Sequence, residues 1–278
     1  MEQQSVLAVF AHPDDEAFGV GGALKMYADR GAKTALVCAT RGEQGEISDP
    51  ALATPEMLGA VREAELRESC RILGIGDLSF LDYRDGRLAQ ANRTEAVGRL
   101  VRHIRRLRPQ VLVTFDANGG YGHLDHIAIH DITGQAFAAA ADRAAYPEQL
   151  AEGLEPYAPR KLYYVAAPRG TMAKISEQLV AMGVDFRPGG NAATIPLEQM
   201  GTPDEEITAV IPLDDEAYEA KRAAWAAHRT QNPADGPFAR LPEAAQRDLW
   251  GTERFVRAAP PASPGQPIED DLFAGIGL

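Results

Sequence analysis

Short apolar runs alternate with helical patterns along the first part of this chain, and this alternation constrains its fold most strongly. Apolar runs of strand length lie at 6–10, 35–39, 78–81, 111–115 and 163–166. Helical patterns lie between them, at 16–30, 55–73, 94–107 and 124–143. Such alternation produces β-α-β units, whose strands run parallel and whose crossovers are right-handed. The sequence therefore predicts an α/β fold with a Rossmann-like, mostly parallel sheet covered by helices on both faces.

The rest of the chain is less regular and rich in proline, with a further strand pattern at 207–211 and a helical pattern at 214–228. We expect residues 1–146 to form the Rossmann-like core that contains the candidate site. Residues 147–257 are expected to belong to the same domain and to shape its pocket. Residues 258–278 form a Pro-rich tail, which is either flexible or docked on the domain.

The formal net charge of −12 argues against a nucleic-acid partner, because phosphate binding depends on clustered lysine and arginine. The one basic cluster, at 102–108, falls in a helical pattern and is interpreted as a solvated helix face. Cys38 and Cys70 lack the spacing of a zinc or redox motif, and no disulfide framework is implied. The first apolar run is too short for a signal peptide or a membrane span, so we expect a cytoplasmic protein without a membrane partner.

Acidic and imidazole side chains cluster after two of the expected strands. The first cluster follows 6–10 and the second follows 111–115; together they hold His12, Asp14, Asp15, Glu16, His123, Asp125, His126 and His130. Ligands of parallel sheets bind outside the carboxyl ends of the strands, where both clusters fall. Three crowded carboxylates repel one another in a partly buried site, and a bound dication removes that cost.

Imidazole and carboxylate ligands with one open position are typical of a catalytic zinc ion, which lowers the pKa of a bound water toward about 7. His12, Asp15 and His126 supply two nitrogens and one carboxylate and fit this pattern. Asp125 could orient one of the imidazoles through its ring N–H. Taken singly, some residues have simpler interpretations, since Asp14 could cap the following helix and His130 could be an ordinary helix histidine.

The glycines of Gly19-Val20-Gly21-Gly22 offer an alternative interpretation as a dinucleotide-binding motif. In such a motif the glycines follow the strand directly, so that a pyrophosphate reaches the start of the helix. Here acidic residues fill that turn and the glycines fall inside the expected helix. Close packing of the helix on the sheet is therefore the better explanation, and a nucleotide-dependent oxidoreductase ranks below a metal site.

The two clusters also show a family resemblance. Ala11-His12-Pro13-Asp14-Asp15-Glu16 and His123-Leu124-Asp125-His126 resemble the paired motifs of the LmbE-like, or PIG-L, family of N-acetylglucosaminyl deacetylases. The resemblance continues at 40–43, 62–65, 83–86 and 227–231, and thus spans residues 5–231. More narrowly, Gly119-Gly120-Tyr121-Gly122-His123 is similar to the deacetylases of the mycothiol and bacillithiol pathways and to the mycothiol S-conjugate amidase.

The resemblance implies a role for each residue that matches the paired motifs. His12, Asp15 and His126 would bind zinc, and iron(II) could occupy the same ligands. Asp14 would be the general base that deprotonates the metal-bound water. His123 would stabilise the tetrahedral oxyanion or protonate the leaving amine.

Looser motifs imply further roles in the same resemblance. Tyr121 would assist the oxyanion and move during turnover, and Asp125 would hold an imidazole in its tautomer. Asp85 and Arg62 would bind sugar hydroxyls, and Glu43 would line the pocket. These assignments describe a site that binds a small amino sugar.

The sequence and the resemblance together predict zinc-dependent hydrolysis of the acetamide of an N-acetylglucosamine conjugate, with the identity of the conjugate left open. The same machinery could serve an amidase that cuts a thiol-conjugated glucosaminyl amide. A non-catalytic sugar-binding or metal-binding protein would be expected if Asp14 or His123 were replaced, and both are present. His228 matches a family position near the pocket, although a core or capping histidine explains it equally well. A homo-oligomer is also compatible with the apolar faces of the C-terminal part.

Overall fold

The computed structural model describes residues 3–277, apart from 185, 188 and 190–192. The described residues form a seven-stranded sheet with the strand order β3-β2-β1-β4-β5-β7-β6. The strands are β1 (Ser5–Phe10), β2 (Lys33–Cys38), β3 (Asp77–Phe80), β4 (Val111–Thr114), β5 (Lys161–Ala166), β6 (Ala209–Pro212) and β7 (Thr252–Ala259). Strands β1 to β5 are parallel, whereas β7 runs antiparallel between β5 and β6. The prediction of an α/β fold with a mostly parallel sheet is confirmed.

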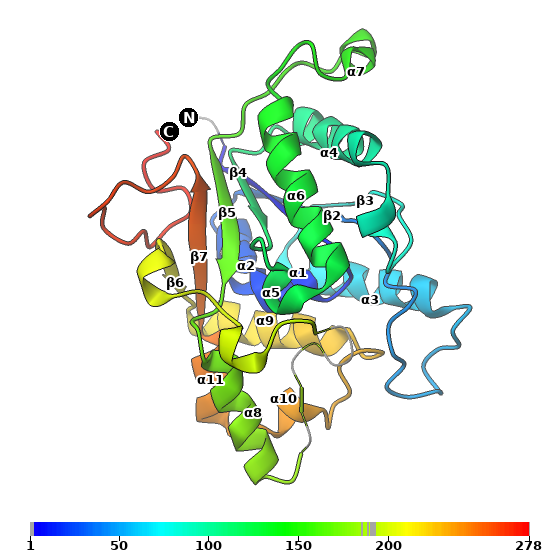
Figure 1. Cartoon of the computed structure of the whole chain (residues 1–278), viewed down its shortest axis with the longest axis vertical. Helices are drawn as coiled ribbons and strands as arrows, with labels where there is room; N and C mark the ends of the chain where they lie inside the picture. The colour runs from blue at the N-terminus through cyan, green and yellow to red at the C-terminus, as the bar shows by residue number, and fades with distance from the viewer. Residues whose placement is uncertain (1–2, 185, 188, 190–192, 278) are drawn as a thin grey trace.

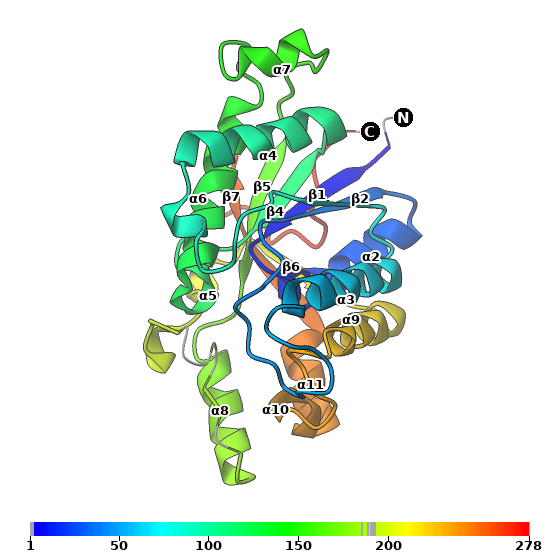
Figure 2. The same cartoon turned by 90° about the vertical axis from the view of Figure 1, so that its right-hand side faces the viewer.

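Helices cover both faces of the sheet (Figures 1 and 2). They are α1 (Asp15–Gly19), α2 (Gly21–Asp29), α3 (Leu58–Leu73), α4 (Arg93–Leu107), α5 (Gly119–Gly122), α6 (Leu124–Ala139), α7 (Pro147–Ala151), α8 (Thr171–Ala181), α9 (Asp215–Ala227), α10 (Pro237–Arg240) and α11 (Glu243–Trp250). Helices α4 and α6 pack together on one face, and α2, α3 and α9 pack together on the other. All residues of β1 are consequently buried, which explains its continuous apolar sequence.

The expected helix at 16–30 is two helices, because the helical backbone is interrupted at Val20, whose φ is −147°. The N–H groups of Gly22 and Ala23 donate to the carboxylate of Glu253 in β7, at 2.8 and 2.9 Å. Lys221 of α9 also donates to this carboxylate, at 2.5 Å. A remote carboxylate thus satisfies the free N–H groups at the start of α2 and stabilises a second helix start. The prediction of one continuous helix was wrong for this reason.

The glycine-rich stretch 19–22 lies at this interruption. A Cβ atom on Gly22 would lie 2.1 Å from Cδ1 of Leu213, so close packing against the segment after β6 explains the glycine. In a dinucleotide-binding fold the pyrophosphate would occupy the start of this helix. Here the carboxylate of Glu253 occupies that position, which removes the basis for the nucleotide-dependent alternative.

The C-terminal part adds an unexpected strand to the sheet. The pattern at 207–211 corresponds to β6, but β7 was not predicted. Beyond β7, the carboxylate of Glu269 accepts hydrogen bonds from Lys161 and Arg257 at 2.7 and 2.6 Å. Leu272 and Phe273 are buried in the main core. These contacts tie residues 269–273 to the sheet.

The basic stretch 102–108 occupies the end of α4 and the residue after it, and one of its arginines is not solvated as predicted. Arg105 is only 2% exposed, and its guanidinium donates to the backbone carbonyls of Asp142 and Ala145 at 2.8 and 2.9 Å. It is buried because the loop after α6 needs donors for these carbonyls. Cys38 and Cys70 are both buried and unpaired. Within the described residues, every helix is too short or too polar to cross a bilayer.

We expect Glu253→Gln to lower the free energy of unfolding by about 3 kcal/mol, because it leaves Lys221 buried without a charged partner. Chemical denaturation of the two proteins measures this difference. Glu219→Gln is the matched control, since Glu219 forms an exposed pair with Arg222 whose loss should change stability by less than about 1 kcal/mol. Equal effects of the two substitutions would contradict the role given to the buried pair.

Candidate functional site

The two predicted clusters meet at the carboxyl ends of neighbouring strands. Strand β1 pairs in parallel with β4, so the turn that follows β1 and the loop that follows β4 lie at the same edge of the sheet. The first turn contains His12 and Asp14, and the loop leads through α5 to His123, which caps α6. His126 lies in the first turn of that helix. The topology therefore brings residues more than a hundred positions apart into one site.

The three predicted metal ligands lie close together and are buried. Nδ1 of His12 lies 3.0 Å from Nε2 of His126 and 3.8 Å from Oδ2 of Asp15. Nε2 of His126 lies 3.4 Å from Oδ1 of Asp15. Ligands of a tetrahedral zinc ion lie about 3.3 Å apart when each bond is about 2.05 Å. The side chains present thus have the donor types and the spacing for one such ion. His123 also lies within this group, since His12, His123 and His126 each offer a nitrogen within 4.8 Å of the others.

Acceptors on the far side orient both imidazole rings. Nε2 of His12 lies 3.0 Å from Oδ1 of Asp85 and 3.5 Å from Oδ2 of Asp125. Nδ1 of His126 lies 3.1 Å from the carbonyl oxygen of Gly119. Each ring thus directs its other nitrogen toward the shared space, an arrangement typical of metal-binding histidines. Asp125 is itself fully buried and accepts the backbone N–H of Gly86 at 2.7 Å.

The electrostatics of the site favour a bound cation. Burial raises the pKa of Asp14 and Asp15, and the positive charges of Arg62 and His12 offset this only in part. Burial lowers the pKa of His12, but hydrogen bonds with Asp125 and Asp85 and the charge of Asp15 raise it overall. Positive side chains therefore compensate the buried carboxylates only in part. A bound dication would stabilise their ionised forms.

Asp14 stands beside the candidate ligands in an unusual backbone conformation, with φ 110° and ψ −25°. Its side chain is 21% exposed, and Oδ2 accepts from Nη2 of Arg62 at 3.1 Å. Arg62 is almost fully buried and also donates to the carbonyl oxygens of Pro13 and Gly42, at 2.6 and 2.9 Å. The guanidinium thus holds the turn that contains Asp14.

His123 has a tautomer that its neighbours define. Its Nδ1 accepts the backbone N–H of Asp125 at 3.1 Å, so the neutral ring carries its proton on Nε2 and can donate it. Burial and the charge of His12 lower the pKa of His123. The ring of Tyr121 lies edge-on to that of His126, with centroids 5.0 Å apart. Tyr121 stands in α5 between glycines of positive φ, which permits the sharp turn of this loop.

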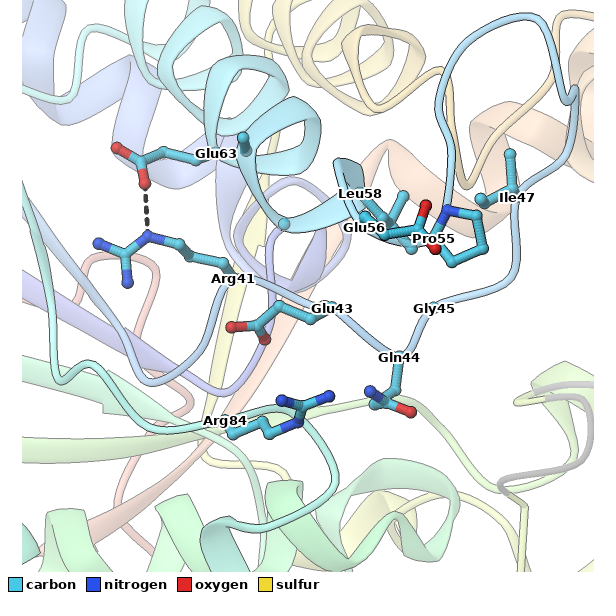
Figure 3. A pocket seen from close by; sticks show the side chains of 12 residues that line it. Arg41, Glu43, Gln44, Gly45, Ile47, Pro55, Glu56, Leu58, Glu63 and Arg84 are labelled. Carbon is cyan, nitrogen blue, oxygen red and sulfur yellow. Dashed lines mark hydrogen bonds and ion pairs between the residues drawn. The ribbon is translucent and has the colours of Figure 1, made fainter.

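Two further predicted residues, Glu43 and Asp85, contact each other beside a cavity. The backbone N–H of Asp85 donates to Oε2 of Glu43 at 3.2 Å. Glu43 lines a cavity of about 740 Å³, and Asp85 lines a neighbouring one of about 530 Å³. Gln44 and Arg84 line both. Figure 3 shows Glu43, Gln44 and Arg84 on one side of the larger cavity, opposite Leu58. Because Asp85 also contacts His12, this polar space adjoins the candidate metal ligands.

His130 and His228, whose roles the sequence left open, have different surroundings. Nδ1 of His130 lies 2.9 Å from the carbonyl oxygen of Phe115, a contact that joins α6 to the residue after β4. His228 is fully buried, and its Nε2 lies 2.8 Å from Oε1 of Glu16. From the sequence alone, Glu16 was expected only to add charge to the first cluster. Its position directly after Asp14 and Asp15 was the only sequence feature that pointed to a role at the site.

Comparisons with known proteins identify relatives of this chain. A family model described as "PIG-L: GlcNAc-PI de-N-acetylase" matches residues 7–137. The chain is 36% identical, over all of both chains, to "1D-myo-inositol 2-acetamido-2-deoxy-alpha-D-glucopyranoside deacetylase" from Thermobispora bispora. A relative from Frankia alni, named as deacetylase 2 for the same compound, is 38% identical over 97% of this chain and 99% of its own.

Solved structures also match. An "N,N'-diacetylchitobiose deacetylase" from Pyrococcus horikoshii has a TM-score of 0.68 and 22% identity, and the match covers 92% of this chain and 84% of that one. At this identity the likeness shows a shared fold.

Proposed function

This chain belongs to the PIG-L family, and from this membership we propose that it hydrolyses the acetamide of an N-acetylglucosamine conjugate. The relatives of similar length are named as deacetylases of an N-acetylglucosaminyl inositol, which supports that conjugate as the first substrate to test. The proposal depends chiefly on one observation. His12, Asp15 and His126 converge at the edge of the sheet, with Asp14 in the same turn as the first two and His123 at the start of the helix that bears the third.

The proposed cofactor is zinc, held by His12, Asp15 and His126, and the same donors suit iron(II). When bound, such an ion would lower the pKa of a coordinated water to about 7 and withdraw electrons from the acetamide carbonyl. Nδ1 of His12 and Nε2 of His126 are the ring atoms that face the shared space. The pKa of His126 is lowered by burial and by the other two histidines, so its ring is neutral and its lone pair is available.

The residues of the chain supply the proton transfers. Asp14 accepts a proton from the attacking water as the oxygen bonds to the carbonyl carbon of the acetamide. The Nε2–H group of His123 donates toward the oxyanion or the departing nitrogen, and Tyr121 supports the oxyanion from the facing loop. The C–N bond then breaks, and the products are acetate and a free amine. Proton transfer of this kind needs a base for the attacking water and a donor for the developing charge or the leaving nitrogen.

The cavity beside the site is the proposed place for the sugar. Glu43 and Asp85 offer carboxylate oxygens that could accept hydrogen bonds from hydroxyl groups. Arg62 directs its donors to Asp14 and to two backbone carbonyls, which favours a role in holding the pocket wall rather than a separate sugar contact. Apart from Arg84, the residues that line the larger cavity all fall between positions 41 and 63, whereas a wide pocket from the C-terminal part would have favoured the thiol-conjugate amidase.

The test is release of amine and acetate from a panel of N-acetylglucosamine compounds, with the inositol conjugate first. Assays with added zinc, with added iron(II) and after chelation identify the metal that supports turnover. A thiol-conjugated glucosaminyl amide in the same panel distinguishes the amidase. Metal-loaded protein that releases neither acetate nor an amine from any of these amides would overturn the proposed function.

We expect His123→Ala to lower kcat by about 10²–10³-fold, the effect typical of losing one donor to an oxyanion. Bound metal should be retained, because the three proposed ligands remain. His130→Ala is the matched control on the same helix, and its kcat should stay near that of the wild type. Steady-state kinetics with elemental analysis checks both variants, and wild-type turnover by His123→Ala would remove this residue from the mechanism.

A further inference from the structure

A fully buried carboxylate lies directly behind the turn that contains Asp14. Oε2 of Glu16 accepts the backbone N–H of Asp14 at 3.0 Å. Its other oxygen, Oε1, accepts from Oγ of Ser69 at 2.5 Å and contacts Nε2 of His228 at 2.8 Å. Glu16, Ser69 and His228 have no exposed surface. We propose that Glu16 is a positioning residue, which holds Asp14 in the orientation needed to accept the proton, with Ser69 and His228 as its anchors.

The backbone of Asp14 explains why such support is needed. Its φ of 110° lies in a region that residues with a Cβ atom rarely adopt. Two contacts oppose relaxation of this conformation. The hydrogen bond to Glu16 fixes the backbone N–H, and the contact with Arg62 at 3.1 Å fixes the carboxylate. Loss of the first contact would let the peptide rotate and would displace the side chain.

The network is built so that Glu16 stays ionised. Burial raises the pKa of its carboxyl, but the charge of His228 and the hydrogen bonds from His228, Ser69 and the Asp14 N–H lower it overall. An ionised group without such partners would be too costly in a water-free position. The anchors come from α3 and from the end of α9, so distant parts of the chain converge on this one turn.

The test compares two substitutions and rests on the proposed role of Asp14 as the base. Glu16→Leu keeps an apolar side chain of similar size but removes the acceptor, and we expect kcat to fall about 100-fold, as for a displaced catalytic group. Glu16→Gln keeps a carbonyl oxygen for the Asp14 N–H and an amide N–H for a neutral His228. It should restore most of the loss, while KM and bound metal stay near wild-type values in both variants.

A second measurement shows whether Glu16 acts through Asp14. In an Asp14→Asn background, Glu16→Leu should cause no further loss of the residual rate, because the displaced group is already inactive. Glu253→Gln removes another buried carboxylate, which binds the start of α2 rather than Asp14, and should lower stability without changing kcat. Equal losses in both backgrounds, or wild-type kcat in Glu16→Leu, would overturn the proposal.

Crystal structures of the Glu16 variants test the same point without activity. In Glu16→Leu the φ of Asp14 should leave the left-handed region, whereas in Glu16→Gln it should not. If Glu16→Leu does not fold, Ser69→Ala serves in its place, with a smaller loss of kcat and a wider spread of Asp14 positions expected. If the wild type is inactive but Asp14 is displaced in Glu16→Leu, only the proposed function is contradicted. An unmoved Asp14 would contradict the positioning role.

Discussion

Asp14→Asn is expected to lower kcat for acetamide hydrolysis by about 10³-fold, within the range of about 10²–10⁴-fold for loss of a general base. The amide cannot accept the proton of the attacking water. Asparagine has the same size and tolerates positive φ better than most residues, so the turn should keep its shape. Metal should be retained, because Asp14 is not among the proposed ligands. Steady-state kinetics and elemental analysis of the same preparation measure both quantities.

Asp82→Asn is a suitable control for this experiment. Asp82 also has a positive φ, of 57°, and it pairs with Arg41 at the surface rather than with the turn that contains Asp14. Its kcat should be unchanged. An Asp14→Asn enzyme that turns over at the wild-type rate would remove Asp14 from the proposed mechanism. Loss of metal in that variant would instead place Asp14 among the ligands.

His12→Ala is expected to weaken metal binding by more than about 100-fold, since even a group that only orients a ligand contributes about 10–100-fold. Activity should disappear with the metal. The wild type should unfold at a higher temperature when zinc is added, because an ion that binds only the folded chain stabilises it. The variant should show no such shift. Elemental analysis and thermal denaturation with and without chelator provide the measurements.

A conservative substitution of Asp125, beside His12, provides a comparison for the metal-binding test of His12→Ala. Asp125→Asn leaves all three proposed ligands in place but weakens the acceptor near Nε2 of His12. Its metal affinity should fall by about 10–100-fold, less than in His12→Ala. Stoichiometric zinc in purified His12→Ala would show that the ion is held elsewhere.

The sequence predicted the central strands well because their physics is local. Strand β1 is buried on both faces, and its apolar residues form a continuous run that needs no information from the rest of the chain. Strand β7 was missed because charged residues interrupt it, among them Glu253 and Arg254. Glu253 is buried there only because Lys221 and the start of α2 neutralise it. Partners this distant in sequence leave no periodic signal.

Part of the candidate site could likewise be predicted from the sequence, and part could not. The convergence of His12 with His126 could be predicted, since both follow strands whose carboxyl ends share one edge of a parallel sheet. The function of Glu16 could not, because its partners Ser69 and His228 come from helices far along the chain. A row of three acids indicates a crowded site but does not tell which acid faces the reaction and which faces the interior.

The cap on α2 has a consequence for how this protein matures on the ribosome. The carboxylate that completes the beginning of this helix belongs to Glu253, 231 positions after Gly22. Because the ribosome synthesises the chain from its N-terminus, residues 11–16 leave the exit tunnel long before Glu253 is made. Pairings between such distant segments close large loops and form late. We therefore expect that chains truncated before β7 do not form the native start of α2, close to the motif at 11–16.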